Sequence, residues 1–185
     1  MRLRLRQASD SGILGPLMAN LVIMTADELK ALNSLERQAA RRAARQQPLV
    51  RLILRTFLQG GAPIPINDIV TRAPDGHDAL MALDADDLIR VRAGQVDVAY
   101  PFSAAPTPFR VRLSTGHERY ACCATDALGI AAMIGEPIDI TSACHHCGES
   151  LHFAATPQGV GSTAQGVMVW FGKRGDDGCK AFDSL

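Results

Sequence analysis

All five cysteines of this 185-residue chain lie in its C-terminal half, and their spacing limits how the fold can be stabilised. They form a vicinal pair, a C-x-x-C pair and a single residue: Cys122, Cys123, Cys144, Cys147 and Cys179. An odd number with these spacings makes a poor disulfide framework. We therefore expect reduced thiols, a cytoplasmic protein, and sulfur available for metal or catalysis. The fold must then rest on an apolar core, which a hydrophobic fraction of 47% permits.

The charges of the chain give no preference for a charged partner. Nineteen basic and nineteen acidic residues cancel, so no net charge steers the protein to nucleic acid or membrane. No run approaches the roughly 18 apolar residues of a membrane span. The apolar stretch from Ile13 to Met24 is interrupted by Gly15, Pro16 and Asn20 and has no clean cleavage site after it, so export is not expected.

Residues 1–47 are predicted to be an arm and a helix. The arm covers residues 1–24, and the helix runs from Thr25 to Arg45, where Thr25 and Glu28 have the spacing of a capping box.

Residues 48–100 are predicted to form a winged-helix-like domain. The expected elements are a helix from Leu49 to Leu58, a short helix capped by Asn67, a helix from Asp75 to Leu83, and a hairpin of Leu88 to Val91 and Val96 to Tyr100 with a turn at Ala93–Gly94. Three short helices followed by a hairpin are typical of winged helix-turn-helix proteins. The third helix carries acidic residues and no Arg or Lys, whereas a DNA-reading helix needs such side chains, so nucleic-acid binding is not favoured.

Residues 101–108 are predicted to be a linker to an α+β core at residues 109–185, built on a mainly antiparallel sheet. The expected elements are strands at Phe109 to Leu113, Ile138 to Ser142, Ser150 to Ala154 and Gly166 to Phe171, and a helix over residues 119–134.

Two groups of residues in this core carry chemistry. Cys123 and Asp126 are three apart at the start of a helix, so both project from one face, and the helix dipole is expected to lower the pKa of the thiol. The sequence Cys144-His145-His146-Cys147-Gly148 has the spacing of a zinc half-site on a tight turn. Zinc at Cys144 and Cys147 and a metal-free turn of reduced thiols are both open interpretations.

The segment from Arg119 to Phe153 resembles the catalytic segment of the organomercurial (alkylmercury) lyases. In that family a Tyr-Ala-aromatic-Cys-Ala-x-Asp pattern precedes an Ile-Gly pair and a strand that enters a Ser-x-Cys turn. The matching residues here are Tyr120, Ala121, Cys122, Cys123, Ala124, Thr125, Asp126, Ile134, Gly135, Ser142, Ala143 and Cys144. The resemblance covers roughly residues 48–171, and the family also places a winged-helix-like domain ahead of the core.

The resemblance implies that Cys123 is the first catalytic cysteine, Asp126 the catalytic aspartate and Cys144 a structural cysteine. The implied reaction is protonolysis of a carbon–mercury bond by thiolates, with a carboxyl group of raised pKa relaying the proton to carbon. No cofactor is required, and Hg(II) stays bound as a product. The implied partners are small organomercurials, cytosolic thiols and a mercuric reductase.

The second thiol of the reaction is open at this stage: it is Cys179, Cys122 or absent from this chain. The family places it near the C-terminus, where Cys179 lies, whereas Cys122 replaces the family's aromatic residue and is a substitute soft ligand. Two other functions compete. One is a non-catalytic protein that binds or senses a soft metal through Cys122, Cys123, Cys144 and Cys147, and the other is a metal-responsive DNA-binding regulator.

Overall fold

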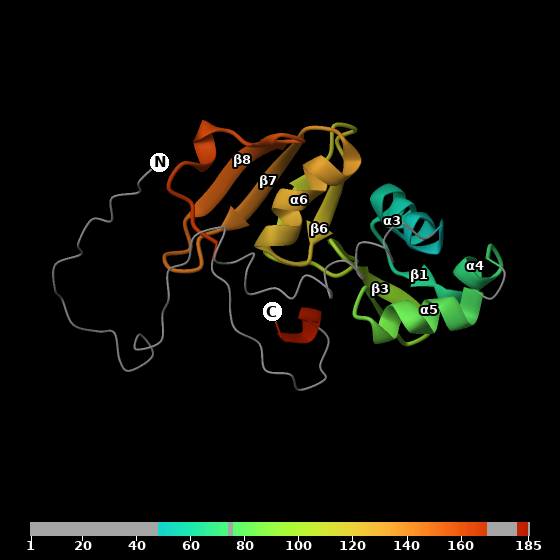
Figure 1. Cartoon of the computed structure of the whole chain (residues 1–185). Helices are drawn as coiled ribbons and strands as arrows, with labels where there is room; N and C mark the ends of the chain where they lie inside the picture. Colours follow the sequence, from blue (N-terminus) through green and yellow to red (C-terminus); the bar gives the residue numbers. More distant parts are fainter. Residues whose placement is uncertain (1–47, 74–75, 170–180, 185) are drawn as a thin grey trace, which may run out of the picture. The chain divides into compact units, whose positions relative to one another are not determined.

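The computed structural model describes residues 48–73, 76–169 and 181–184 (Figure 1). The predicted arm at residues 1–24, the predicted helix from Thr25 to Arg45, and Cys179 lie outside the described residues.

Three helices precede the first hairpin, as the sequence predicted. They are α3 (Pro48–Gly60), α4 (Ile66–Val70) and α5 (Gly76–Ala85), with the short strand β1 (Ile64–Pro65) between the first two. Helix α3 buries one apolar face, made of Leu49, Val50, Ile53 and Phe57.

The predicted cap of the second helix was wrong. Asn67 lies inside α4, whose N-cap is Pro65, and no side chain caps this helix. The cause is Pro65 itself, because proline accepts the extended backbone before a helix and lets the helix begin one residue earlier than Asn67.

The predicted hairpin is present as β2 (Ile89–Arg92) and β3 (Gln95–Ala99). Its turn is Ala93–Gly94, where φ is 50° and 75°. Two residues with positive φ match the twist of antiparallel strands, which explains why the chain reverses at this point.

The segment predicted as a linker contains a strand of the sheet. Strand β4 (Phe102–Ser103) pairs with β3 on one side and with β6 (Glu118–Ala121) on the other. Both of its residues are buried. The prolines at 101, 106 and 108 indicated a linker, but they flank the strand and do not interrupt its hydrogen bonds.

The predicted helix over residues 119–134 begins later than expected. Residues 118–121 form β6, which pairs with β5 (Arg110–Arg112), and the helix α6 covers Ala124–Ile134. Side chains of β6 alternate between exposed and buried positions, which is the period of a strand. Residues 118–121 form a strand and not the first turn of a helix because they hydrogen-bond to β4 on one side and to β5 on the other.

The strands around the C-H-H-C-G segment are paired as predicted. They are β7 (Ile138–Ala143) and β8 (Ser150–Thr156), which pair in antiparallel register from Ile138–Ala155 to Ala143–Ser150. A short strand β9 (Gly159–Val160) and a 3-10 turn η2 (Ser162–Ala164) follow.

The predicted strand from Gly166 to Phe171 is wrong in its described part, because residues 167–169 have no strand structure. Val167 and Met168 are exposed there and are not covered by the sheet as strand residues would be.

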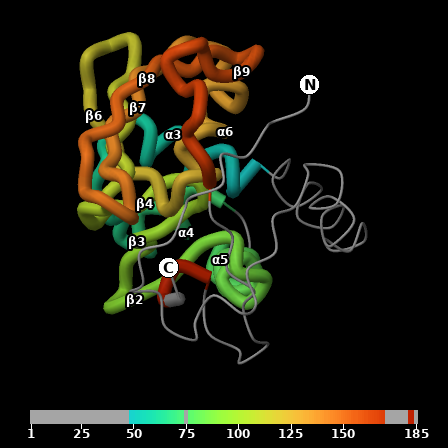
Figure 2. The backbone as a smooth tube through the Cα atoms, turned by 90° about the vertical axis from the view of Figure 1, so that its left-hand side faces the viewer, coloured from blue at the N-terminus to red at the C-terminus, as the bar shows by residue number. Residues whose placement is uncertain are grey.

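The described strands form one antiparallel sheet in the order β1-β3-β4-β6-β5-β7-β8-β9 (Figures 1 and 2). Strand β2 is not in this order; it pairs with the edge of β3 opposite to the edge that β1 and β4 share. Helix α6 packs against β6, β7 and β8. The predicted α+β class with a mainly antiparallel sheet is therefore confirmed. In the part of the chain that the structure describes, no helix has the length and apolarity to cross a membrane.

Candidate active site

Cys123 forms the N-cap of α6, the position at which the chain leaves the sheet and enters the helix. Its backbone is extended, with φ −149° and ψ 179°, and its Sγ accepts a hydrogen bond from the backbone N–H of Asp126 at 3.4 Å. The first N–H groups of a helix have no partner within the helix, so a side-chain acceptor is favoured at this position. The sulfur is thus held by the local backbone, at the end of β6.

Asp126 faces the same sulfur from the first turn of α6. The thiol of Cys123 donates a hydrogen bond to Oδ2 of Asp126, with Sγ and Oδ2 3.1 Å apart. Two contacts therefore join the residues, one from the Asp126 backbone to the sulfur and one from the thiol to the Asp126 carboxylate. The bond from the Asp126 N–H to the sulfur is one half of a capping box, and the thiol takes the place that the backbone N–H of the N-cap residue has in the other half.

The expected lowering of the Cys123 pKa is wrong. Burial of the thiol raises its pKa, and the charge of Asp126 and its hydrogen bond to the thiol raise it further. The backbone N–H of Asp126 and the side chain of Thr125 act in the opposite direction and are outweighed. The helix N-terminus alone would have stabilised a thiolate, but a neighbouring carboxylate and partial burial have the larger effect. Cys123 is consequently a protonated thiol whose proton points at a carboxylate.

Cys122 is a buried, protonated thiol next to this pair. It is 3% exposed, and its backbone N–H donates to the carbonyl of Pro101 at 2.9 Å. Burial raises the pKa of Cys122 strongly, with further contributions from Asp126 and Cys123, while Arg90 acts to lower it. The positive charge of Arg90 therefore partly offsets the effect of burial on the Cys122 thiol.

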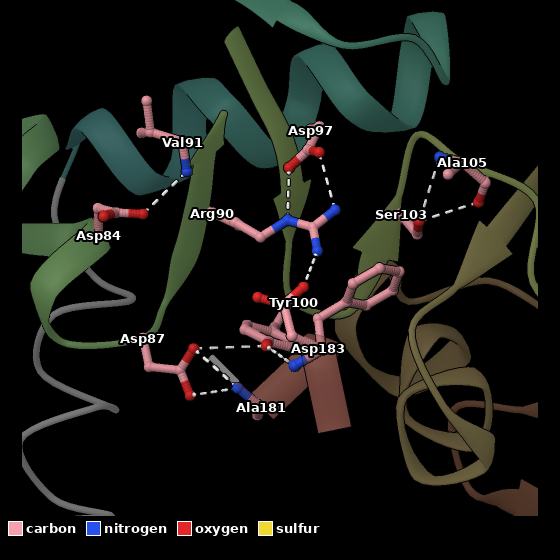
Figure 3. Close-up of polar contacts among 11 residues, drawn as sticks. Asp84, Asp87, Arg90, Val91, Asp97, Tyr100, Ser103, Ala105, Ala181 and Asp183 are labelled. Carbon is pink, nitrogen blue, oxygen red and sulfur yellow. Dashed lines mark hydrogen bonds and ion pairs between the residues drawn. The ribbon is translucent and has the colours of Figure 1, made fainter. Parts of the chain in front are cut away.

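Arg90 is the centre of a buried polar cluster that the sequence analysis did not identify (Figure 3). It is 8% exposed, and its Nε and Nη2 donate to the two carboxylate oxygens of Asp97 at 2.9 and 2.8 Å. Its Nη1 donates to Asp183, and its guanidinium lies 4.5 Å from the centre of the Phe182 ring. One arginine therefore joins the hairpin to residues at the C-terminal end of the chain.

The C-terminal turn η3 (Ala181–Ser184) is attached to the hairpin by its backbone as well. The N–H of Phe182 donates to the Tyr100 hydroxyl at 2.8 Å, and the N–H of Ala181 lies 3.2 Å from Oδ2 of Asp87. Figure 3 shows these contacts converging on Tyr100 and Asp87. Burial and the charge of Asp87 raise the pKa of Tyr100. Tyr100 precedes Pro101, whose carbonyl accepts the N–H of Cys122 at 2.9 Å, so the attachment point borders the thiol pair.

No local pattern predicts this cluster. Arg90 and Asp183 are 93 positions apart, and the only sequence signal is a charged residue in a strand whose neighbours are apolar.

Cys144 and Cys147 occupy the turn between β7 and β8. The N–H of Gly148 donates to the carbonyl of Cys144 at 2.8 Å, and Gly148 has φ 72°, which favours glycine at this position. Hydrogen bonds from the backbone of Cys147 and His146 lower the pKa of the Cys144 thiol. Among the described residues, no group of three or more Cys, His, Asp or Glu side chains is placed to hold a metal. Hence the structure does not bring Cys122, Cys123, Cys144 and Cys147 into one site.

The fold and the thiol–carboxylate pair define a class: an α+β protein whose antiparallel sheet delivers a cysteine to the N-terminus of a helix. The family model of MerB, described as alkylmercury lyase, matches residues 102–185. Residues 102–185 are therefore similar to the alkylmercury lyases.

Individual relatives agree with the family model. The chain is 30% identical over 128 residues to an alkylmercury lyase of Staphylococcus epidermidis, covering 65% of this chain and 56% of that protein. It is 28% identical over 130 residues to an alkylmercury lyase of Streptomyces lividans, covering 69% and 59%. The chain thus spans less than two thirds of the length of these relatives.

A solved structure is similar in fold. The crystal structure of the mercury-bound form of MerB2 superposes with a TM-score of 0.54 at 19% identity, over 68% of this chain and 66% of that one. At this identity the likeness concerns the fold.

Proposed function

We propose that this chain cleaves the carbon–mercury bond of small organomercurials by protonolysis, with Cys123 as the nucleophile and Asp126 as the proton carrier. The observation that supports this best is the hydrogen bond from the Cys123 thiol to the Asp126 carboxylate. It places a proton between a soft ligand for mercury and a base that can store it. The similarity of residues 102–185 to the alkylmercury lyases supports the same reaction.

The first step is capture of the metal. The Cys123 sulfur binds mercury in R–Hg–SR′, its proton passes to Asp126, and the small thiolate R′S⁻ leaves. A raised pKa keeps the free thiol protonated, so the proton is already present when the substrate arrives. Asp126 thereby changes from acceptor to acid without recruiting a proton from solvent.

The second step breaks the carbon–mercury bond. A second thiolate adds to mercury, its own proton being taken up by a small thiolate in solution, and the protonated Asp126 delivers its proton to the carbon. The hydrocarbon R–H leaves, and Hg(II) remains between two sulfurs. Sulfur on both sides of the metal weakens its bond to carbon, and such soft ligands suit mercury. Small cytosolic thiols and a mercuric reductase are the proposed acceptors of the product.

We propose Cys179 as the second thiol, with Cys122 as the alternative. Cys179 lies outside the described residues, but it is two residues before Ala181, and two residues span at most about 7 Å. Ala181 and Phe182 are attached to Asp87 and Tyr100, and Tyr100 precedes the Pro101 that accepts a hydrogen bond from Cys122. Cys122 directly precedes Cys123 but is 3% exposed, and burial raises its pKa strongly, so it is a poorer metal ligand.

We interpret residues 48–100 as a winged-helix-like unit that supports the site and does not read DNA. The order α3, β1, α4, α5, β2 and β3 is that of a winged helix, and helix α5 carries no Arg or Lys. Its hairpin contributes Arg90 and Tyr100 to the cluster that borders the thiols.

The test is direct detection of the hydrocarbon. Purified protein would be incubated with phenylmercury and excess thiol, and benzene in the headspace would be quantified by gas chromatography. We expect turnover that is lost in Cys123→Ser and falls by about 10²–10⁴ in Asp126→Asn, since general acid catalysis contributes that much. Asp139→Asn is a matched control, because Asp139 is a carboxylate on β7 paired with Arg112. Tight mercury binding without benzene release would favour a soft-metal binding protein instead.

A further inference from the structure

The turn between β7 and β8 has the features of a metal site separate from the thiol–carboxylate pair. We propose that Cys144 and Cys147 bind one thiophilic metal ion, such as Hg²⁺ or Cu⁺, through two sulfurs and no further protein ligand. This inference does not depend on carbon–mercury cleavage, since it concerns binding of the ion alone.

The backbone of the turn is closed by hydrogen bonds on both sides. The N–H of Cys144 donates to the carbonyl of Glu149 at 2.8 Å, which continues the β7–β8 ladder beyond Ala143 and Ser150. Within the loop that this hydrogen bond closes, the N–H of Gly148 donates to the carbonyl of Cys144 at 2.8 Å. The positive φ of Gly148, 72°, allows the chain to rejoin β8 immediately after Cys147. Both cysteines are consequently held on a short turn whose ends are fixed by the sheet.

The geometry of the turn brings the two cysteines to the same side of the chain. The hydrogen bond from the N–H of Gly148 to the carbonyl of Cys144 closes a single helix-like turn, and residues three apart on such a turn are neighbours. Two neighbouring thiolates are the form of cysteine that binds a soft metal ion.

Exposure argues against a purely structural role for this pair. Cys147, His145 and His146 are exposed and Cys144 is half-buried, whereas a cysteine used for packing is typically among the most buried residues. Cys122 provides that comparison in the same chain, at 3% exposure. The two thiols of the turn are thus open to ions and small thiols in solution.

The number of ligands selects the kind of ion. A structural zinc site needs four ligands, and no third Cys, His, Asp or Glu joins the pair within the described ranges. Hg²⁺ and Cu⁺ are satisfied by two thiolates in line, and soft sulfur favours both. In the binding reaction, one Hg²⁺ ion and two cysteine thiols form an S–Hg–S unit and release two protons.

The test uses the full chain with Cys122, Cys123 and Cys179 replaced by serine, so that Cys144 and Cys147 are its only thiols. Titration with HgCl₂ against a competing monothiol would be followed by the ultraviolet charge-transfer band of mercury–sulfur bonds. We expect one equivalent to bind, and X-ray absorption to show two sulfur neighbours. Adding Cys147→Ser should weaken binding by about a hundredfold or more, because the second sulfur no longer acts intramolecularly.

The matched control is the same background with His145→Ala and His146→Ala, which should bind Hg²⁺ as tightly as its parent. The melting temperature of each variant would be compared with that of the triple-serine parent. Replacements at Cys147, His145 and His146 should leave it unchanged, because these residues are exposed. Equal Hg²⁺ affinity with and without Cys147 would overturn the proposal. So would a loss of binding in the histidine variant, because it would indicate a site of four ligands. The absence of Cys123 from every variant keeps this result independent of the lyase assay.

Discussion

The Sγ atom of Cys123 lies 3.1 Å from Oδ2 of Asp126, and the thiol is the donor of this hydrogen bond. The same sulfur accepts the backbone N–H of Asp126, so the residues that cap the helix are also the pair proposed to transfer the proton. A change at Asp126 should therefore alter both the acidity of the thiol and the proposed chemistry, and these two effects can be separated.

Asp126→Asn should make Cys123 more acidic while it reduces hydrocarbon release. The charge and hydrogen bond of Asp126 raise the pKa of Cys123, so their removal shifts thiolate formation to lower pH. Alkylation of Cys123 by iodoacetamide across a pH series, followed by peptide mass spectrometry, would measure that shift. An alkylation midpoint that stays in place, or moves upward, would show that Asp126 does not control the thiol.

The buried thiols should make the protein less stable at alkaline pH. Burial raises the pKa of Cys122, so below the ordinary thiol pKa, about 8.5, folded and unfolded chains both keep the proton. Above that pH the unfolded state ionises first, and the free energy of unfolding falls as pH rises. For Cys122 the loss reaches about 2 kcal/mol by pH 10. Urea unfolding at pH 7.5 and pH 10 with a reductant would measure it, and Cys122→Ala should show a smaller decrease than the parent. The same decrease in both proteins would contradict this assignment.

The double variant Phe182→Ala with Asp183→Ala should lose activity more than stability. The Asp183 side chain is 49% exposed, so its ion pair with Arg90 contributes at most about 1 kcal/mol to unfolding. If Cys179 is the second thiol, detaching η3 removes its anchor, and hydrocarbon release should fall by about tenfold or more. Chemical unfolding and the headspace assay would be compared on the same preparation. Unchanged release would instead favour Cys122.

Arg90→Met tests the other side of the same cluster. The Asp97 carboxylate, with a 20% exposed side chain, would lose its bidentate partner, and breaking such a buried pair costs about 3–5 kcal/mol. The midpoint of urea unfolding should fall accordingly. Arg112→Met is the control, because its pair with Asp139 is exposed, and its effect should stay within about 1 kcal/mol.

Two glycines of the α6 segment should have opposite effects on stability when replaced by alanine. Gly135 ends α6 with φ 76°, so Gly135→Ala should lower the free energy of unfolding by about 1 kcal/mol. Gly129 lies within the helix and a Cβ there meets nothing within 4 Å, so Gly129→Ala should raise it by about 0.5–1 kcal/mol. Thermal unfolding of both variants would measure the difference. Destabilisation by Gly129→Ala would mean that α6 is packed more tightly at this face than the structure indicates.

Features that depend on local spacing were predictable from the residues alone. Cys123 and Asp126 were predicted to share a helix face because they are three residues apart, and their side chains do meet. The hairpin turn at Ala93–Gly94 and the pairing of β7 with β8 were also predicted, since turn residues and alternation are local signals.

Features that depend on distant neighbours became visible only in the folded chain. Residues 118–121 are a strand because β4 and β5 flank them, although their own apolar pattern also fits a helix. The pKa of Cys123 is raised because burial and the Asp126 carboxylate outweigh the helix terminus, and burial cannot be read from spacing. Arg90 reaches Asp183 across 93 positions, a contact that exists only once the sheet has formed. Local hydrogen bonding thus fixed the thiol–carboxylate pair, whereas packing over long sequence distances fixed its protonation and its surroundings.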